Sequence, residues 1–227
     1  MNIEDSRKNH RKRMRQRIAD KGHGSLVDYE LVEVLLYGVQ AQGDTKPLAK
    51  ALLKHFGSIQ ELVQAPYDEL IRIDGVGPMT AQSIALIREF NLRISKHEAF
   101  DRAPLLQSWD AVIAHCRMTI GHSRTEKFMA IYLDSMNGLI TEDVFETGTV
   151  NKVTVYPREI VKSALAHHAV AVIIVHNHPS DNTTPSKQDI AMTKTIRDAL
   201  NTVDIALHDH LIISKSNVSS FKTLGLM

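Results

Sequence analysis

The sequence predicts a chain of two parts, an all-α N-terminal domain followed by an α/β domain in which helices flank a mixed sheet. Apolar residues recur every three or four positions between Leu26 and Ile94, which is the period of packed helices. From about Trp109 onward, short β-branched runs alternate with helical stretches, as in layered α/β folds. We expect residues 1–97 to form the helical domain, 98–106 a linker and 107–227 the α/β domain.

The composition is that of an ordinary folded protein. The chain has 227 residues, of which 43% are hydrophobic and 23% are charged. The single cysteine, Cys116, excludes an intrachain disulfide, and the longest purely apolar run, 169–175, is too short to cross a bilayer. No apolar segment follows the basic N-terminus as it would in a secretory signal. These features predict a cytoplasmic protein without a membrane partner.

Positive charge is concentrated at the N-terminus. Residues 1–24 carry eight basic and three acidic residues, a net charge of +5, although the whole chain has a net charge of only +1. Arg7, Arg11 and Arg15 share one face of a helix over residues 7–17. This basic arm is either a contact for DNA phosphates or a solvated helix face.

A helix-hairpin-helix-like element follows within the helical half. Residues 68–73 and 79–88 read as helices, and Gly75 and Gly77 form the tight turn between them. In such a hairpin the exposed backbone N–H groups near Gly75 and Gly77 can hold a DNA phosphate without reading sequence. Similar hairpins also serve as packing units or protein docks. Residues 25–100 carry seven basic and ten acidic residues, which weakens the electrostatic case for DNA.

The second half alternates helices and strands. The expected helices span 108–118, 159–168 and 186–201, and the expected strands span 128–133, 150–155, 169–175 and 205–213. Thr184 and Pro185 are expected to start the last helix, as its N-cap and its first helical residue.

Three polar residues around the most apolar strand form a candidate metal site. His176 and His178 close that strand, and side chains two apart on a strand point the same way, so one ion could bind both rings. Asp189 projects onto the apolar side of the following helix, where a carboxylate needs a partner such as a metal ion. Two histidines and one carboxylate leave a fourth position for water, as in catalytic zinc sites. The alternatives are satisfied strand-end histidines and a capping box between Asp189 and Ser186.

These residues also carry a family resemblance. His176, His178, Ser186 and Asp189 match the JAMM (MPN+) metalloprotease motif, His-x-His-x7-Ser-x2-Asp, at every required position. Their surroundings resemble the RadC family of bacteria, often labelled DNA repair proteins, over nearly the whole chain. The segments that carry this resemblance are His-Asn-His-Pro-Ser (176–180), Pro-Ser-Lys-Gln-Asp (185–189), Tyr-Pro-Arg-Glu-Ile (156–160) and Asp-His-Leu-Ile-Ile (209–213). One departure is Asp181, where RadC sequences usually have glycine.

The resemblance implies an MPN+ domain that binds one zinc ion through His176, His178 and Asp189. It further implies that Glu126, just before the strand at 128–133, acts as general base and then general acid, and that Ser186 donates a hydrogen bond to the oxyanion. The Asp-His pair of the family falls on Asp209 and His210, which are candidates to orient a zinc-bound ring; for Asp209 a solvated strand end is the alternative.

The function implied is zinc-dependent hydrolysis of a peptide or isopeptide bond in a protein or peptide substrate, through a zinc-activated water. The alternative is a DNA-associated repair or recombination accessory protein that uses the hairpin and the basic arm, with the MPN domain as a scaffold or acting on nucleic acid.

Overall fold

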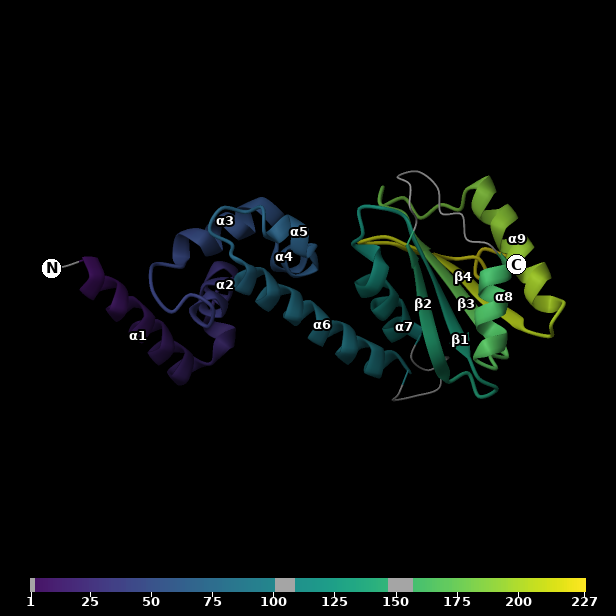
Figure 1. Ribbon diagram of the computed structural model, residues 1–227, viewed down its shortest axis with the longest axis horizontal. Helices are drawn as coiled ribbons and strands as arrows, with labels where there is room; N and C mark the ends of the chain where they lie inside the picture. Colours follow the sequence, from purple (N-terminus) through teal and green to yellow (C-terminus); the bar gives the residue numbers. More distant parts are fainter. Residues whose placement is uncertain (1–2, 101–108, 147–156) are drawn as a thin grey trace. The chain divides into compact units, whose positions relative to one another are not determined.

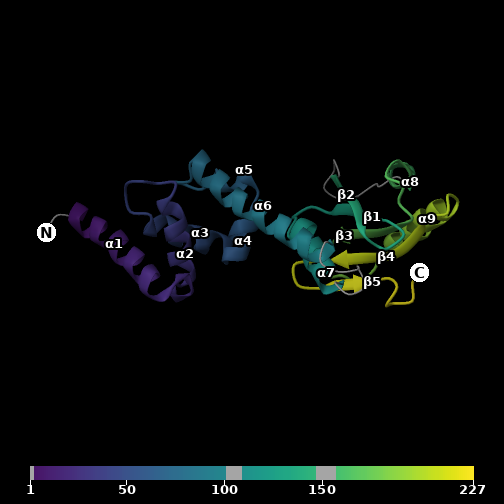
Figure 2. The ribbon, with the colours of Figure 1, turned by 90° about the horizontal axis from the view of Figure 1, so that it is seen from below.

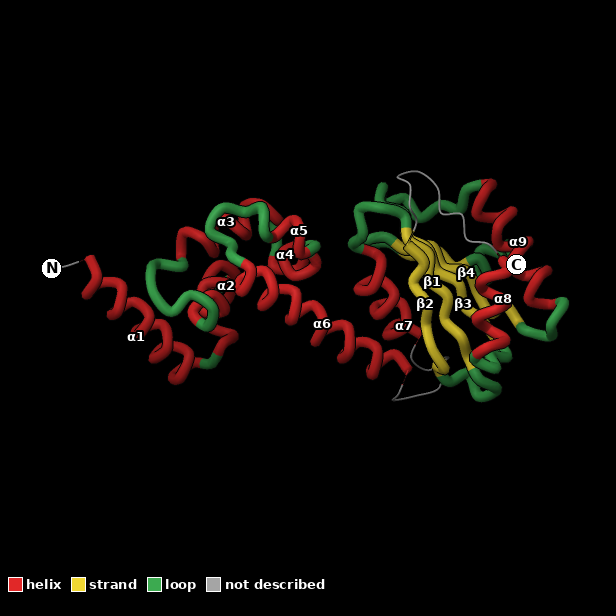
Figure 3. Tube along the Cα trace, viewed as in Figure 1, coloured by secondary structure: helices red, strands yellow, loops and turns green. Residues whose placement is uncertain are grey.

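The computed structural model describes residues 3–100, 109–146 and 157–227, and the chain divides into two compact units, Met1–Phe90 and Asn91–Met227 (Figure 1). The first unit contains only helices among its described residues, whereas all the strands lie in the second (Figure 3). The expected fold class, an all-α part followed by a mixed sheet with helices, is confirmed. None of the described helices combines the length and the apolar character needed to span a bilayer.

The N-terminal unit is a set of helices around one apolar core. Leu36, Leu52, Leu62 and Leu70 are fully or almost fully buried in it. Local sequence signals separate the helices: a glycine with φ of 86° ends one, and the side chain of Ser58 caps the start of the next. The helices are α1 (Ile3–Lys21), α2 (Asp28–Tyr37), α3 (Lys46–Phe56), α4 (Ile59–Gln64), α5 (Tyr67–Leu70) and the first part of α6 (Pro78–Phe100), with a 3-10 turn at His23–Ser25.

The predicted hairpin is formed by α5, the turn after it and α6. Gly75 has φ of 83°, a conformation that favours glycine, and α6 begins at Pro78. The prediction ended the second helix at residue 88, but α6 continues to Phe100 because no glycine or proline interrupts it. Residues 98–100 of the expected linker are therefore helical, and its remaining residues lie outside the described residues.

The C-terminal unit is built on a five-stranded sheet with the order β2-β1-β3-β4-β5. Strands β3 and β4 are parallel and the other neighbours are antiparallel, so the sheet is mixed. Figure 2 shows the strands in this order, from β2 to β5. The elements are α7 (Trp109–Cys116), a π-helical turn (Arg117–Gly121), β1 (Lys127–Leu133), β2 (Leu139–Glu146), α8 (Pro157–Ala166), β3 (Ala171–Asn177), α9 (Lys187–Asn201), β4 (Ala206–Ile213) and β5 (Val218–Ser220).

Helices cover both faces of this sheet. On one face, Val112 and Cys116 of α7 pack against alternate residues of β1 and β3. Helices α8 and α9 lie over the other face (Figure 1), where Ile160 and Ile196 pack against the intervening strand residues. Every residue of β3 is buried, as expected of a central strand covered on both sides.

Strand β2 was not predicted, and its acidic residues are the reason. Glu142 and Asp143 point to opposite faces of the sheet, and each has a partner there. Ser163 of α8 donates a hydrogen bond of 2.6 Å to Asp143, whereas Glu142 contacts His115 and Lys96. The strand expected at 150–155 lies outside the described residues.

The partners of Glu142 tie three elements together. His115 Nε2 of α7 lies 3.0 Å from one carboxylate oxygen, and Lys96 Nζ of α6 lies 3.1 Å from the other. Burial alone would raise the pKa of Glu142, but the hydrogen bond and charge of His115, together with Lys96, lower it below its ordinary value of 4.5. A lowered pKa means that this network stabilises the fold at neutral pH, and that the contribution is lost as pH falls through the folded-state pKa.

Replacing Glu142 with glutamine is expected to lower the free energy of unfolding at pH 7 by about 2 kcal/mol, since it removes a partly buried charge that is paired with Lys96 and hydrogen-bonded to His115. The difference from wild type should shrink between pH 7 and pH 3, because the contribution of a carboxylate with a lowered pKa decreases once the pH falls below its ordinary pKa. Urea unfolding at both pH values, followed by the fluorescence of Trp109, the only tryptophan, measures this. Glu159→Gln, at a partly exposed position of α8, is the control, and a loss for Glu142→Gln that is equal at both pH values would contradict the prediction.

Candidate metal centre

Strand β3 and the turn after it position both histidines. His176 pairs with Phe128 of β1 and Ile212 of β4, and it is only 4% exposed. His178 is held by its backbone, because its N–H donates to Ile213 O at 2.9 Å. Its ring is also held, because Nδ1 lies 2.6 Å from Asn182 O. A carbonyl oxygen can only accept, so Nδ1 of His178 carries the hydrogen and Nε2 of the neutral ring presents its lone pair.

The turn explains the departure from the family pattern at Asp181. This residue has φ of 63°, in the left-handed region that glycine adopts without steric cost. Aspartate is one of the residues that tolerate the region. Here it also contacts the loop before β5, because Ser216 N and the Asn217 side chain donate to its side-chain and backbone oxygens, respectively.

Asp189 lies in the first turn of α9 and is held by a capping box. The helix begins at Lys187 with Ser186 as its N-cap, so the expected start at Thr184 and Pro185 is wrong. Ser186 Oγ accepts from Asp189 N at 3.1 Å, and Ser186 N donates to Asp189 Oδ2 at 2.7 Å. The capping alternative thus describes a real contact, and it coexists with contacts from Asp189 to both histidines. The box holds the carboxylate in one orientation towards the rings.

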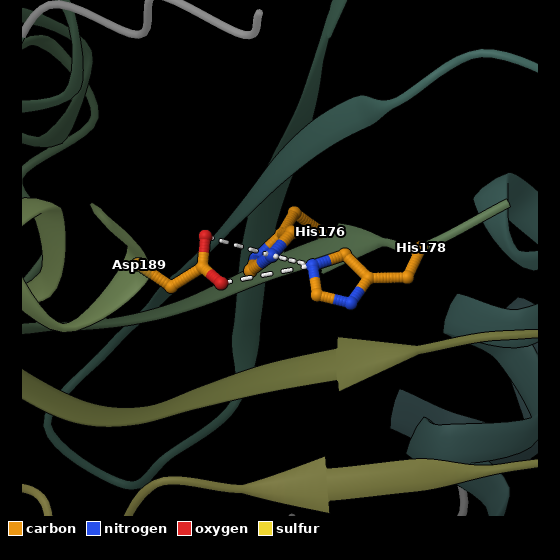
Figure 4. Close-up of side chains that lie close together, drawn as sticks. All are labelled: His176, His178 and Asp189. Carbon is orange, nitrogen blue, oxygen red and sulfur yellow. Dashed lines mark hydrogen bonds and ion pairs between the residues drawn. The ribbon is translucent and has the colours of Figure 1, made fainter. Parts of the chain in front are cut away.

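The two rings and the carboxylate converge (Figure 4). Nε2 of His176 lies 3.0 Å from Nε2 of His178 and 3.4 Å from Oδ1 of Asp189. Nε2 of His178 lies 3.7 Å from Oδ2 of Asp189. One potential ligand atom from each residue lies within 4.8 Å of the others. Burial would raise the pKa of Asp189, but the contact with His176 and the hydrogen bonds from Ser186 lower it well below its ordinary value. The carboxylate is therefore ionised at neutral pH.

This donor set is suited to a divalent cation of zinc type. When both rings present lone pairs, no hydrogen lies between the two Nε2 atoms, which are 3.0 Å apart. Their lone pairs and the ionised carboxylate then point to one place, where a cation can bind them. Nitrogen ligands favour zinc over magnesium or calcium. Three protein ligands also leave one tetrahedral position open. The residues therefore fit a zinc ion.

The predicted pair Asp209 and His210 divides between the two faces of β4. His210 is fully buried, and its Nε2 lies 2.8 Å from Nδ1 of His176, so it contacts a candidate ligand directly. Burial, which disfavours the imidazolium, lowers the pKa of His210 well below its ordinary value. Thr193 of α9, which sequence reasoning missed, contacts the other nitrogen of His210 at 2.6 Å.

Asp209 is buried rather than a solvated strand end, and the partners of its carboxylate lie away from the candidate ligands. It is 3% exposed, and its carboxylate accepts hydrogen bonds from Ser220 Oγ at 2.6 Å and from Lys222 N at 3.0 Å. Successive side chains of a strand point to opposite faces, so Asp209 cannot share the face of His210. Its contacts hold the segment after β5 against β4.

Glu126 immediately precedes β1 and is half-buried. In the antiparallel pairing of β1 with β3, Phe128 lies opposite His176, and the same register extended by two residues would set Glu126 opposite His178. Asn177, fully buried, clamps the segment that carries Glu126. Its Oδ1 accepts from Lys127 N at 2.6 Å, and its Nδ2 donates to the carbonyl oxygens of residues 123 and 125. Asn177 was missed because its side chain points away from the histidines on either side of it.

The candidate DNA contacts of the N-terminal unit differ from one another in how open their surroundings are. Gly77 is exposed, and nothing lies within 4 Å of the position where its Cβ would be, whereas a Cβ on Gly75 would contact Leu48. In the basic arm, Arg11 donates to carbonyl oxygens of residues 40, 41 and 43 and lies over the ring of Tyr37. Arg11 thus holds a loop of its own unit.

Comparisons with known proteins match the two parts of the chain to two different family models. Residues 106–226 match the family model of the RadC-like JAB domain, and residues 36–90 match that of the helix-hairpin-helix motif. A UPF0758 protein of Ruegeria pomeroyi is 41% identical over 220 residues, which cover 97% of this chain and 98% of that protein. The similarity therefore extends over both units.

Proposed function

The chain belongs to the RadC family, and from this premise we propose that its C-terminal domain is a zinc-dependent hydrolase that cleaves a peptide or isopeptide bond. The observation that carries the proposal is the convergence of His176, His178 and Asp189 within 4.8 Å. Nε2 of each histidine and a carboxylate oxygen of Asp189 would hold the ion. When bound, zinc polarises a carbonyl group and lowers the pKa of a water molecule.

Glu126 would act as the proton carrier of the reaction. It accepts the proton of the attacking water and delivers it to the nitrogen of the leaving amine as the amide bond breaks. Asn177 supports this role because it fixes the backbone on both sides of Glu126. A side chain on a backbone fixed in this way has less conformational freedom to lose during the reaction.

Ser186 would donate a hydrogen bond to the oxygen of the substrate carbonyl as negative charge develops on it. Its N-cap contact uses a lone pair of Oγ, because Oγ accepts from Asp189 N. The hydroxyl hydrogen is therefore still able to donate. Ser186 is exposed at the start of α9, where a substrate can reach it.

The test is digestion of a proteome-derived peptide library and of isopeptide-linked peptides by the zinc-loaded protein, with products identified by mass spectrometry. We expect new amino termini or released isopeptides that disappear after chelation and return when zinc is restored. Products that are equally abundant with Asp189→Asn would contradict the proposal, as would a full screen without products from a protein that holds zinc.

A second candidate function is binding of DNA through the hairpin, favoured by the family-model match over residues 36–90 and by the exposed turn before α6. Backbone N–H groups at such a turn can hold a phosphate without reading sequence. The arm contributes less than its composition indicates, because Arg11 and Arg17 contact their own unit. Lys12, Arg13 and Arg15 are exposed.

We expect wild-type protein to shift duplex DNA in a gel at low salt and to lose this binding steeply as salt rises. Gly77→Asp should weaken binding about tenfold, because it adds a negative charge beside the phosphate contact. Gly24→Asp is the matched control, since Gly24 is also exposed, has no positive φ and has open space around its Cβ position. Absence of a shift at low salt would overturn this second function, and equal weakening by both variants would exclude the hairpin as the contact.

A further inference from the structure

A chain of hydrogen bonds leads from His176 through His210 to Thr193. Nδ1 of His176 lies 2.8 Å from Nε2 of His210, and Nδ1 of His210 lies 2.6 Å from Oγ1 of Thr193. Thr193 Oγ1 in turn donates to the backbone oxygen of Asp189 at 2.6 Å. The three side chains are 4% exposed or less, so water does not compete for these contacts.

The last contact determines the direction of the whole chain. A carbonyl oxygen can only accept, so the single hydroxyl hydrogen of Thr193 points to Asp189 O. Oγ1 of Thr193 must then accept from His210, which places the ring hydrogen of the neutral His210 on Nδ1. Nε2 of His210 is left as an acceptor, and the hydrogen between the two rings therefore belongs to Nδ1 of His176.

We propose that Thr193 is a positioning residue that, through His210, fixes the tautomer of His176 with hydrogen on Nδ1 and the lone pair of Nε2 facing His178 and Asp189. The inference rests on the proposed metal site, because it assigns a purpose to that lone pair. The backbone contact of His178 with Asn182 sets the same tautomer in the second ring, so both rings are prepared before an ion arrives.

The relay also links α9 to β3. Thr193 lies one helical turn after Asp189, so one helix supplies both the carboxylate and the hydroxyl that orients a ring on the strand. Removal of this hydroxyl would therefore change the tautomer of a ligand ring while all three ligand residues stay in place.

The decisive variant is Thr193→Val, which keeps the shape of the side chain and removes the hydroxyl. The ring of His210 then has no acceptor for its Nδ1 hydrogen, which favours hydrogen on Nε2, and His176 would carry its own hydrogen on Nε2, towards the site. We expect long-range ¹H–¹⁵N spectra of the metal-free protein to show this change for His176, with its signals identified from His176→Ala. We also expect zinc affinity, measured by competition with a chelator, to fall about 10- to 100-fold.

Two further variants make the test specific. Thr193→Ser keeps a hydroxyl and should restore both the spectrum and the zinc affinity. Thr195→Val is the matched control, because Thr195 on the same helix donates to the backbone oxygen of Ala191 at 2.9 Å but is exposed. It should leave His176 and zinc binding unchanged.

An unchanged His176 tautomer in Thr193→Val would overturn the relay, as would equal losses of affinity in Thr193→Val and Thr195→Val, or in Thr193→Val and Thr193→Ser. Failure of the proposed function would look different. In that case the wild type itself would bind no zinc, while the spectra of the metal-free protein would still report whether Thr193 sets the tautomer.

Discussion

Replacing His178 with alanine is expected to lower the zinc content of the purified protein from about one ion per chain to almost none. The side chain supplies one of three protein ligands, and its loss leaves His176 and Asp189 alone. If three ligands share about 10 kcal/mol of binding free energy, removal of one lowers affinity by ~100- to 1000-fold. Mass spectrometry of metals, after dialysis against zinc at neutral pH, measures the content directly.

The control for this variant is His167→Ala, which removes an exposed histidine of the same domain. Zinc should also raise the melting temperature of the wild type and of His167→Ala, but not that of His178→Ala, since only a folded state that binds the ion is stabilised. Equal zinc content in wild type and His178→Ala would remove the basis of the proposed function. The turn itself should survive the substitution, because its backbone bond to Ile213 does not depend on the side chain.

The Glu126→Gln variant is expected to retain zinc and to lose ~100- to 10,000-fold in turnover, the usual contribution of a general base. Glutamine has the size of glutamate and can accept a hydrogen bond, but it cannot take the proton of the attacking water. Because the loss affects the reaction and not binding, kcat should fall while KM changes little. The measurement is hydrolysis of the best substrate from the library, with zinc content determined on the same preparations.

Glu159→Gln, at a partly exposed position of α8 where the carboxylate pairs with Arg158, provides the comparison and should keep wild-type turnover. Turnover near the wild-type level in Glu126→Gln would show that another group carries the proton. Loss of zinc together with activity would instead place Glu126 among the ligands. Together with His178→Ala, this variant separates binding of the ion from proton transfer.

Hydrophobic periodicity was enough to predict most of the fold. The helical half, the hairpin around Gly75 and Gly77 and three of the strands in the described ranges were expected from it. A regular apolar pattern shows which face of a helix or strand is buried, and it can be recognised from neighbouring residues alone. Strand β2 was missed because Glu142 and Asp143 interrupt its apolar pattern. Their partners, His115 and Ser163, are distant in the sequence, so only tertiary contact explains how a sheet accommodates them.

The candidate site shows the same division. Spacing along the chain was enough to identify the possible ligands, because His176 and His178 share a face of one strand and Asp189 lies on the apolar side of the next helix. The orientation of their atoms could not be predicted in this way, because it depends on packing. The tertiary structure separated His210 from Asp209, and it brought Thr193 and Asn177 into supporting contacts. The physical reason is that spacing along the chain sets the face from which a side chain projects, whereas hydrogen-bond partners depend on how strands and helices pack against each other.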